Sequence, residues 1–269
     1  MSIQTVSPRF AGLAGDSLGD DDLRPPLVLL HGLTFDRRLW GPVLRELSTV
    51  DPGRRVLNLD LPGHGESPRR ESYLLNEVAP VIQEAVEEAG LRAPVMVGHS
   101  AGAVLATIYA SQYPTSGVVN VDQPLLTTRF AALLHAHEAA LRSPGYLAVW
   151  NMMAAGMQTE LLPPEAQELV RTLGDPRQDL LLGYWEDVLT WSVDELTDRI
   201  VAGLEAVRAT GVPYHTVFGQ TPGAEYETWL TGLLPDAVCS VLPDSGHFPH
   251  LAHPRRFARL LADTARWPE

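Results

Sequence analysis

Short apolar runs alternate with longer amphipathic segments along the first half of the chain. The apolar runs have strand length, and the segments between them carry apolar residues at helical spacing. Because neighbouring parallel strands need a crossover, usually a helix, this alternation predicts βαβ units and a mostly parallel sheet with helices on both faces. The predicted strands lie at residues 27–30, 56–59, 95–97 and 118–121, and the predicted helices at 37–47, 74–88 and 101–112.

The pattern changes after residue 124. Helical segments then follow one another without a strand, separated by prolines, and the alternation returns after residue 208. We therefore predict a core of residues 1–124 and 209–269 that is interrupted by a helical insertion at 125–208. Helices are predicted at 128–141, 145–157, 164–173, 176–191, 194–208, 224–233 and 254–265, and strands at 214–218 and 238–242.

The pentapeptide Gly-His-Ser-Ala-Gly at residues 98–102 stands between the predicted strand 95–97 and the predicted helix 101–112. In this setting the pattern G-x-S-x-G forms a sharp strand-to-helix turn that exposes a serine hydroxyl above the sheet. The flanking glycines fit such a turn, because it leaves no room for side chains on either side. Ser100 is therefore the predicted nucleophile.

Three further motifs follow predicted strands. His31-Gly32 follows strand 27–30, Asp-Leu-Pro-Gly-His-Gly-Glu-Ser at 60–67 follows strand 56–59, and Ser-Gly-His-Phe at 245–248 follows strand 238–242. Taken in order with the pentapeptide, these motifs resemble the α/β-hydrolase superfamily. The resemblance implies an α/β-hydrolase fold, with a mostly parallel central sheet flanked by helices and a helical cap inserted after the sixth strand. It implies a serine nucleophile and says almost nothing about the substrate.

A serine hydroxyl needs a base to take its proton, and the base needs a carboxylate to orient it. His247, on the loop after the last predicted strand, is the predicted base. The superfamily usually places the acid after the seventh strand, where this chain has Pro222 and the nearest acid is Glu225. A second arrangement in the superfamily places the acid after the sixth strand, where Asp122 stands. We predict Asp122 as the acid and keep Glu225 as the alternative.

The developing oxyanion of an acyl-transfer reaction needs hydrogen-bond donors. The predicted donors are the backbone N–H groups of Ala101, at the start of the helix, and Leu33, directly after His31-Gly32. Aromatic and thioether side chains in the insertion suit a bulky, mostly apolar ligand. The predicted pocket residues are Trp40, Trp150, Met153 and Trp185.

These residues predict a serine hydrolase that cleaves a carboxylic ester or lactone with an apolar or aromatic part through an acyl-enzyme. A cofactor-free dioxygenase of the same fold is the first alternative, because such relatives pair a histidine base with an aspartate after the sixth strand. Ser100 would then only bind the substrate. A ligand-binding scaffold without activity is the second alternative.

The chain has 269 residues and a formal net charge of −13, which argues against nucleic acid and anionic membranes as partners. It shows no apolar run of membrane-spanning length and no signal-peptide pattern at its start. We therefore expect a cytoplasmic protein with a small-molecule partner, and a homodimer stays open. Cys239 is the single cysteine and is expected to be a buried strand thiol. Without zinc-ligand spacing or a phosphate-binding loop, cofactor-free catalysis is expected.

Overall fold

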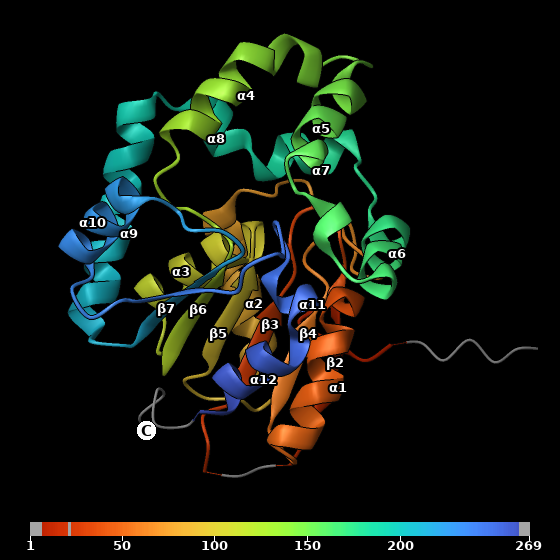
Figure 1. The fold of residues 1–269 in the computed structure, drawn as a ribbon, viewed down its shortest axis with the longest axis vertical. Helices are drawn as coiled ribbons and strands as arrows, with labels where there is room; N and C mark the ends of the chain where they lie inside the picture. The colour runs from red at the N-terminus through yellow and green to blue at the C-terminus, as the bar shows by residue number, and fades with distance from the viewer. Residues whose placement is uncertain (1–6, 21–22, 264–269) are drawn as a thin grey trace, which may run out of the picture.

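The computed structural model describes residues 7–20 and 23–263, and one sheet runs through the middle of them (Figure 1). The strands found in these residues are β1 (Arg9–Phe10), β2 (Leu13–Leu18), β3 (Leu27–Leu30), β4 (Val56–Leu59), β5 (Val95–His99), β6 (Gly117–Val121), β7 (Tyr214–Phe218) and β8 (Val238–Val241). Their order across the sheet is β1-β2-β4-β3-β5-β6-β7-β8.

The strands from β3 to β8 run parallel to one another, and the two N-terminal strands at one edge pair antiparallel. The mostly parallel sheet predicted from the alternation of strands and helices is therefore confirmed. In a parallel sheet the carboxyl ends of the strands lie at the same edge. The loops that follow β3, β4, β5 and β8 carry the sequence motifs, the loop after β6 carries Asp122, and all of them meet at this edge.

Helices cover both faces of the sheet, because alternate side chains of a strand point to opposite faces. On one face Leu27 and Leu29 belong to a buried cluster, and on the other face Val28 and Leu30 belong to a second, larger one. The first face is covered by η1 (Arg37–Trp40), α1 (Gly41–Val50), α11 (Pro249–Ala252) and α12 (Pro254–Ala262), and the second by α2 (Leu75–Glu88), α3 (Ala101–Gln112), α9 (Val193–Thr210) and α10 (Ala224–Leu233).

The last strand, β8, forms an edge of the sheet and pairs with β7. Its side chains are exposed or half-buried, and Cys239 is exposed. The expectation of a buried thiol is wrong. It rested on the apolar run around Cys239, and an edge strand lacks the neighbour that would cover such a run on its outer side.

Most of the helices between β6 and β7 lie above the carboxyl edge of the sheet at the top of Figure 1, while α9 runs down beside the sheet. Residues 125–208 are here termed the cap. Its final helix, α9, packs against α3 and so ties the cap to the layer that flanks the sheet. The single helix predicted at 176–191 is two helices, because the backbone leaves helical geometry at Trp185. The other cap helices are α4 (Thr128–Leu141), α5 (Tyr146–Ala155), η2 (Thr159–Leu161), α6 (Pro164–Leu173), α7 (Gln178–Tyr184) and α8 (Glu186–Thr190).

None of the helices within the described ranges is both long enough and apolar enough to span a membrane.

His250, in α11, is fully buried, and neither of its ring nitrogens has a hydrogen-bond partner among the described residues. Its ring packs against Trp40 and Phe257, with centroids 4.6 and 6.1 Å apart. Burial lowers the pKa of His250 to about 3, because the charged imidazolium loses its hydration there. The folded protein therefore holds this side chain neutral at pH values where the unfolded chain protonates it.

We expect the free energy of unfolding to fall as the pH drops below about 6.5, because the unfolded chain then binds a proton that folded His250 does not. This group contributes a slope of about 1.4 kcal/mol per pH unit until the pH approaches its folded pKa. His250→Leu should remove that part of the slope, measured by urea unfolding at several pH values. An unchanged slope in this variant would contradict the assignment of a neutral His250.

Candidate active site

Ser100 lies at the turn between β5 and α3, with φ 52° and ψ −123°. This positive φ is rare for a residue with a side chain and marks a strained turn. The glycines on either side make the turn sterically allowed. A Cβ at Gly98 would lie 2.1 Å from the carbonyl oxygen of Gly102, and a Cβ at Gly102 would lie 2.4 Å from that of Leu30. The turn therefore has the strand–turn–helix geometry that the sequence predicted.

The register of β5 and β6 brings Ser100 and Asp122 to neighbouring positions at the sheet edge. His99 pairs with Val121, and each candidate residue directly follows one of them. The N–H of Ser100 donates to the carbonyl oxygen of Val121 at 3.0 Å, while that of Asp122 donates to Val217 at 2.9 Å. Both candidate residues thus remain tied to the sheet where their strands end.

His247 faces Asp122 across the sheet edge. Its Nδ1 lies 2.7 Å from Asp122 Oδ2, and the other carboxylate oxygen accepts a 2.8 Å hydrogen bond from the N–H of Gly219. A carboxylate only accepts hydrogen bonds, so Nδ1 carries the proton and Nε2 is free to act as a base. The sequence did not reveal the contact from Gly219, although this glycine follows β7 directly.

Glu225, the alternative acid, lies in the first turn of α10 and is exposed. It lines the same cavity as His247 but makes no hydrogen bond or ion pair with it among the described residues. Asp122 is thus the carboxylate that contacts the candidate base.

Leu33 and Ala101 both line the cavity that contains Ser100. Within the described ranges, neither backbone N–H has a hydrogen-bond partner. Both groups are therefore free of a competing acceptor there, and their role as oxyanion donors stays a prediction.

Two buried histidines hold the loop that carries Leu33. The Nε2 of His31 accepts a hydrogen bond of 3.0 Å from the N–H of Leu61, and the Nε2 of His64 accepts one of 3.1 Å from Thr34. Burial lowers the pKa of both histidines, so both are neutral and able to accept. The loops after β3 and β4 are thereby locked to each other.

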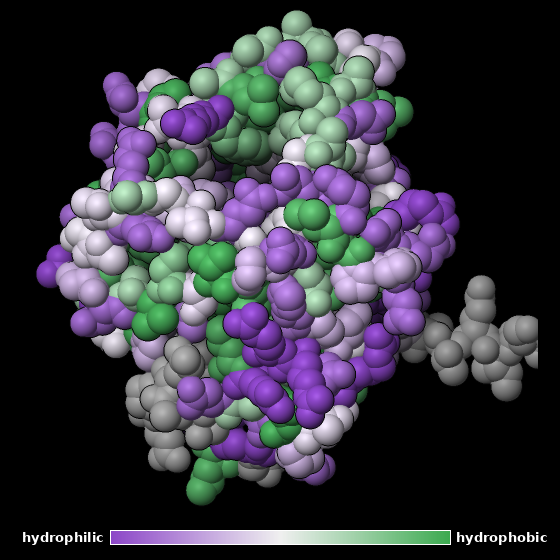
Figure 2. Space-filling model, viewed as in Figure 1, coloured by the Kyte–Doolittle hydropathy of each residue, from purple (hydrophilic) through white to green (hydrophobic). Residues whose placement is uncertain are grey.

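A cavity of about 1410 Å³ lies between the sheet edge and the cap and contains both Ser100 and His247 in its lining. Trp150, Met153 and Trp185 of the cap also line it, in the place that the sequence predicted for a substrate pocket. Figure 2 shows that apolar surface gathers on the cap, at the top of the view. The site is therefore a large, mostly apolar chamber with polar groups on its floor.

Trp40 does not line this cavity. It is fully buried in the cluster between the sheet and helices α1 and α12, where its ring stacks on Phe257 with the centroids 6.1 Å apart. The prediction that Trp40 contacts the pocket is therefore corrected. Trp40 ends η1, which begins shortly after the loop that carries Leu33, but its side chain points into the core between the sheet and α12.

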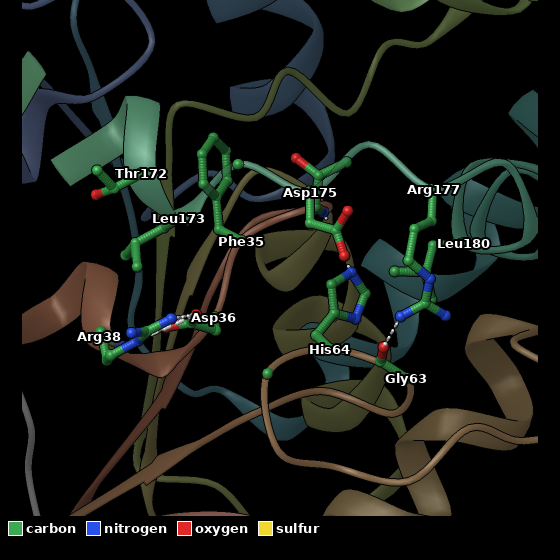
Figure 3. Close-up of a pocket in the computed structure, with 13 residues that line it drawn as sticks. Phe35, Asp36, Arg38, Gly63, His64, Thr172, Leu173, Asp175, Arg177 and Leu180 are labelled. Atoms are coloured by element: carbon green, nitrogen blue, oxygen red, sulfur yellow. Dashed lines mark hydrogen bonds and ion pairs between the residues drawn. The ribbon is translucent and has the colours of Figure 1, made fainter. Parts of the chain in front are cut away.

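Figure 3 shows a second, smaller cavity of about 250 Å³, and Phe35 lines both cavities. The two arginines that line the smaller cavity already have partners. Arg38 donates to Asp36 at 2.6 Å, and Arg177 donates to the carbonyl oxygen of Gly63 at 2.8 Å. The turn of residues 98–102 around Ser100, here termed the nucleophile elbow, does not line this cavity. We therefore locate the candidate site in the larger one.

The part of the chain that the structure describes contains no group of three or more histidine, cysteine or acidic side chains arranged to hold a metal ion.

Comparison with known proteins gives the family of the chain. The family model described as alpha/beta hydrolase family matches residues 27–260. The chain belongs to this family. The resemblance seen in the sequence motifs and the α/β-hydrolase fold are thereby confirmed.

The similar curated proteins include enzymes of different names. The chain is 27% identical to 2-succinyl-6-hydroxy-2,4-cyclohexadiene-1-carboxylate synthase of Enterobacter sp. (strain 638), over 90% of this chain and 92% of the relative. It is also 27% identical to pimeloyl-[acyl-carrier protein] methyl ester esterase of Yersinia enterocolitica, over 92% of this chain and 94% of the relative.

Among solved structures, that of AqDC, described as the basis for recognition and ring-cleavage of the Pseudomonas quinolone signal, gives a TM-score of 0.78. It is 18% identical to this chain, and the match covers 94% of this chain and 95% of that one. At this identity the likeness concerns the fold alone.

A substitution at Gly98 tests directly whether the turn at Ser100 excludes side chains. Gly98→Ala should lower the free energy of unfolding by at least about 3 kcal/mol and abolish activity, because its Cβ would overlap backbone atoms. Gly232→Ala is the matched control, since a Cβ there meets nothing within 4 Å. In helix α10 this control should be neutral or stabilise by up to about 1 kcal/mol. Equal urea midpoints for the two variants would contradict the steric argument.

Proposed function

We propose that this chain is a serine hydrolase that cleaves a carboxylic ester or lactone with an apolar or aromatic part. The 2.7 Å contact between His247 Nδ1 and Asp122 Oδ2 carries the proposal, because it lies in the same cavity as Ser100. A histidine that is oriented by a carboxylate and lines the same cavity as a half-buried serine fits the arrangement that activates a hydroxyl nucleophile.

In the first half of the reaction, Ser100 Oγ forms a bond to the carbonyl carbon of the substrate while its proton passes to His247 Nε2. Asp122 keeps the Nδ1 proton in place and stabilises the imidazolium. The carbonyl oxygen becomes an oxyanion that accepts hydrogen bonds from the N–H groups of Leu33 and Ala101. When the tetrahedral intermediate collapses, the C–O bond breaks and His247 gives its proton to the departing alkoxide.

In the second half, water attacks the acyl-enzyme and His247 Nε2 takes a proton from it. The second tetrahedral intermediate collapses, Ser100 Oγ leaves and recovers its proton from His247, and the carboxylic acid is released. The same residues therefore serve both half-reactions, and atoms and charge balance without a cofactor.

The substrate class follows from the cavity walls. Trp150, Met153 and Trp185 offer apolar area and adaptable packing, which suits an apolar or aromatic group rather than a highly charged one. The name of the Yersinia relative, a methyl ester esterase, supports ester hydrolysis as the reaction.

A cofactor-free dioxygenase is the second candidate, because Asp122 stands after the sixth strand. In that reaction His247 deprotonates an aromatic substrate, and Ser100 only binds it. The two candidates differ in their need for oxygen and for the serine.

We expect a fluorophosphonate probe to label Ser100, and p-nitrophenyl esters of short to medium chain to be hydrolysed equally well in air and under nitrogen. Ser100→Ala should lower turnover by at least about 10³-fold, because the triad acts as a unit. Ser111→Ala is the matched control, since Ser111 lies in α3, the helix that begins directly after Ser100, and does not line the cavity. Oxygen uptake with a heteroaromatic substrate, together with negligible esterase turnover, would contradict the proposal.

A parallel experiment distinguishes Asp122 from Glu225 as the acid that orients His247. Asp122→Asn should lower kcat by about 10³- to 10⁴-fold, because an amide in that place favours the wrong tautomer of His247. Glu225→Gln should change kcat by less than about twofold, since Glu225 does not contact the base. A larger loss in the Glu225 variant, or equal small losses in both, would overturn the assignment of the acid.

A further inference from the structure

His99 directly precedes Ser100 in the 98–102 turn, and its side chain contacts the loop that carries His247. Its Nε2–H donates a hydrogen bond of 2.8 Å to the backbone carbonyl oxygen of His247. The centroids of these two rings are 4.7 Å apart, and the His99 ring also packs against Phe248 and His250. His99 thus links the strand that leads into Ser100 to the loop of the candidate base, which is 148 residues away in sequence.

The surroundings of His99 determine which of its ring nitrogens carries the proton. A carbonyl oxygen can only accept, so the proton of the neutral ring is on Nε2. Complete burial lowers the pKa of His99 well below its usual value, and the neighbouring histidines act in the same direction. Its Nδ1 has no hydrogen-bond partner in the described part of the chain. This nitrogen lies so close to Gly32 that a Cβ there would approach it to 2.7 Å.

The backbone of His247 is held from two sides. Its N–H donates to the carbonyl oxygen of Met157 in the cap at 2.9 Å, and its own carbonyl oxygen accepts from His99. A Cβ at Gly246 would lie 2.3 Å from the Met157 oxygen, so the loop packs tightly on the cap. Because the two peptide planes around His247 are fixed, the direction of its Cα–Cβ bond is fixed as well.

We propose that His99 is a positioning residue, which holds the imidazole of His247 within proton-transfer reach of Ser100 by donating to its backbone carbonyl. This role rests on the proposed function, in which His247 is the base. Asp122 sets the rotation of the ring, whereas His99 sets the place from which the side chain starts. A displacement of about 1 Å at such a group can cost about 100-fold in rate.

A pure packing role is the competing explanation, and His250 offers the comparison. It is as completely buried as His99 and lies 4.7 Å from it between ring centroids. Among the described residues its two ring nitrogens make no hydrogen bond. Replacing either histidine by leucine removes a buried imidazole from one cluster, but only one of the two replacements removes a donor to His247.

The experiment compares kcat and KM for a p-nitrophenyl ester in three variants. His99→Leu should lower kcat by about 10- to 100-fold with KM changed less than about twofold, because the base is displaced while the pocket is intact. His99→Gln retains an N–H donor near the same position and should recover most of kcat. His250→Leu should leave kcat unchanged.

Equal losses of kcat in His99→Leu and His99→Gln would overturn the proposal, as would a loss in His250→Leu equal to that in His99→Leu. If His99→Leu does not fold, the comparison of His99→Gln with His99→Asn tests the proposal. The shorter asparagine side chain does not reach the carbonyl oxygen of His247, so His99→Asn should have the lower kcat. Equal kcat values in these two variants would overturn the positioning role of His99. If a fluorophosphonate fails to label the wild-type protein, the proposed hydrolase function itself is overturned. Labelled wild type with a fully active His99→Leu would overturn only the role of His99.

Discussion

The parallel pairing of β5, β6 and β7 is the constraint on which the candidate site depends. In this register His99 lies beside Val121, so Ser100 and Asp122 leave adjacent strands at the same edge. Both residues have positive φ, and both N–H groups donate to the next strand. The hydrogen bonds of the sheet therefore offset the strain of two left-handed residues, and the strained backbone holds both side chains above the edge.

The cap is part of the same construction. The carbonyl oxygen of Met157 accepts from the N–H of His247, so the cap contributes to the position of the candidate base as well as to the walls of the cavity. Those walls are largely apolar. In the proposed reaction, a low local dielectric strengthens the interaction between the imidazolium of His247 and Asp122. Cap and core thus act on the same histidine from opposite sides.

Much of this architecture is local and was predictable from the sequence. Apolar runs at 27–30 and 95–97 become strands because they are covered on both faces, and the glycines at 98 and 102 permit the elbow because the turn excludes side chains. Each of these features depends on residues within one strand–turn–helix unit. The same local logic failed at Cys239, where burial depends on whether a neighbouring strand exists.

The sequence by itself therefore determined the parallel sheet, the elbow at Ser100 and the membership of the alpha/beta hydrolase family. Only the tertiary structure decided which carboxylate contacts His247, because Asp122 and His247 are 125 residues apart and meet through strand register. The tertiary structure also places Trp40 in the core rather than in the pocket, and it contains the hydrogen bond from His99 to the carbonyl oxygen of His247. Contacts between distant segments follow from how the layers pack, and no single segment of the sequence contains that information.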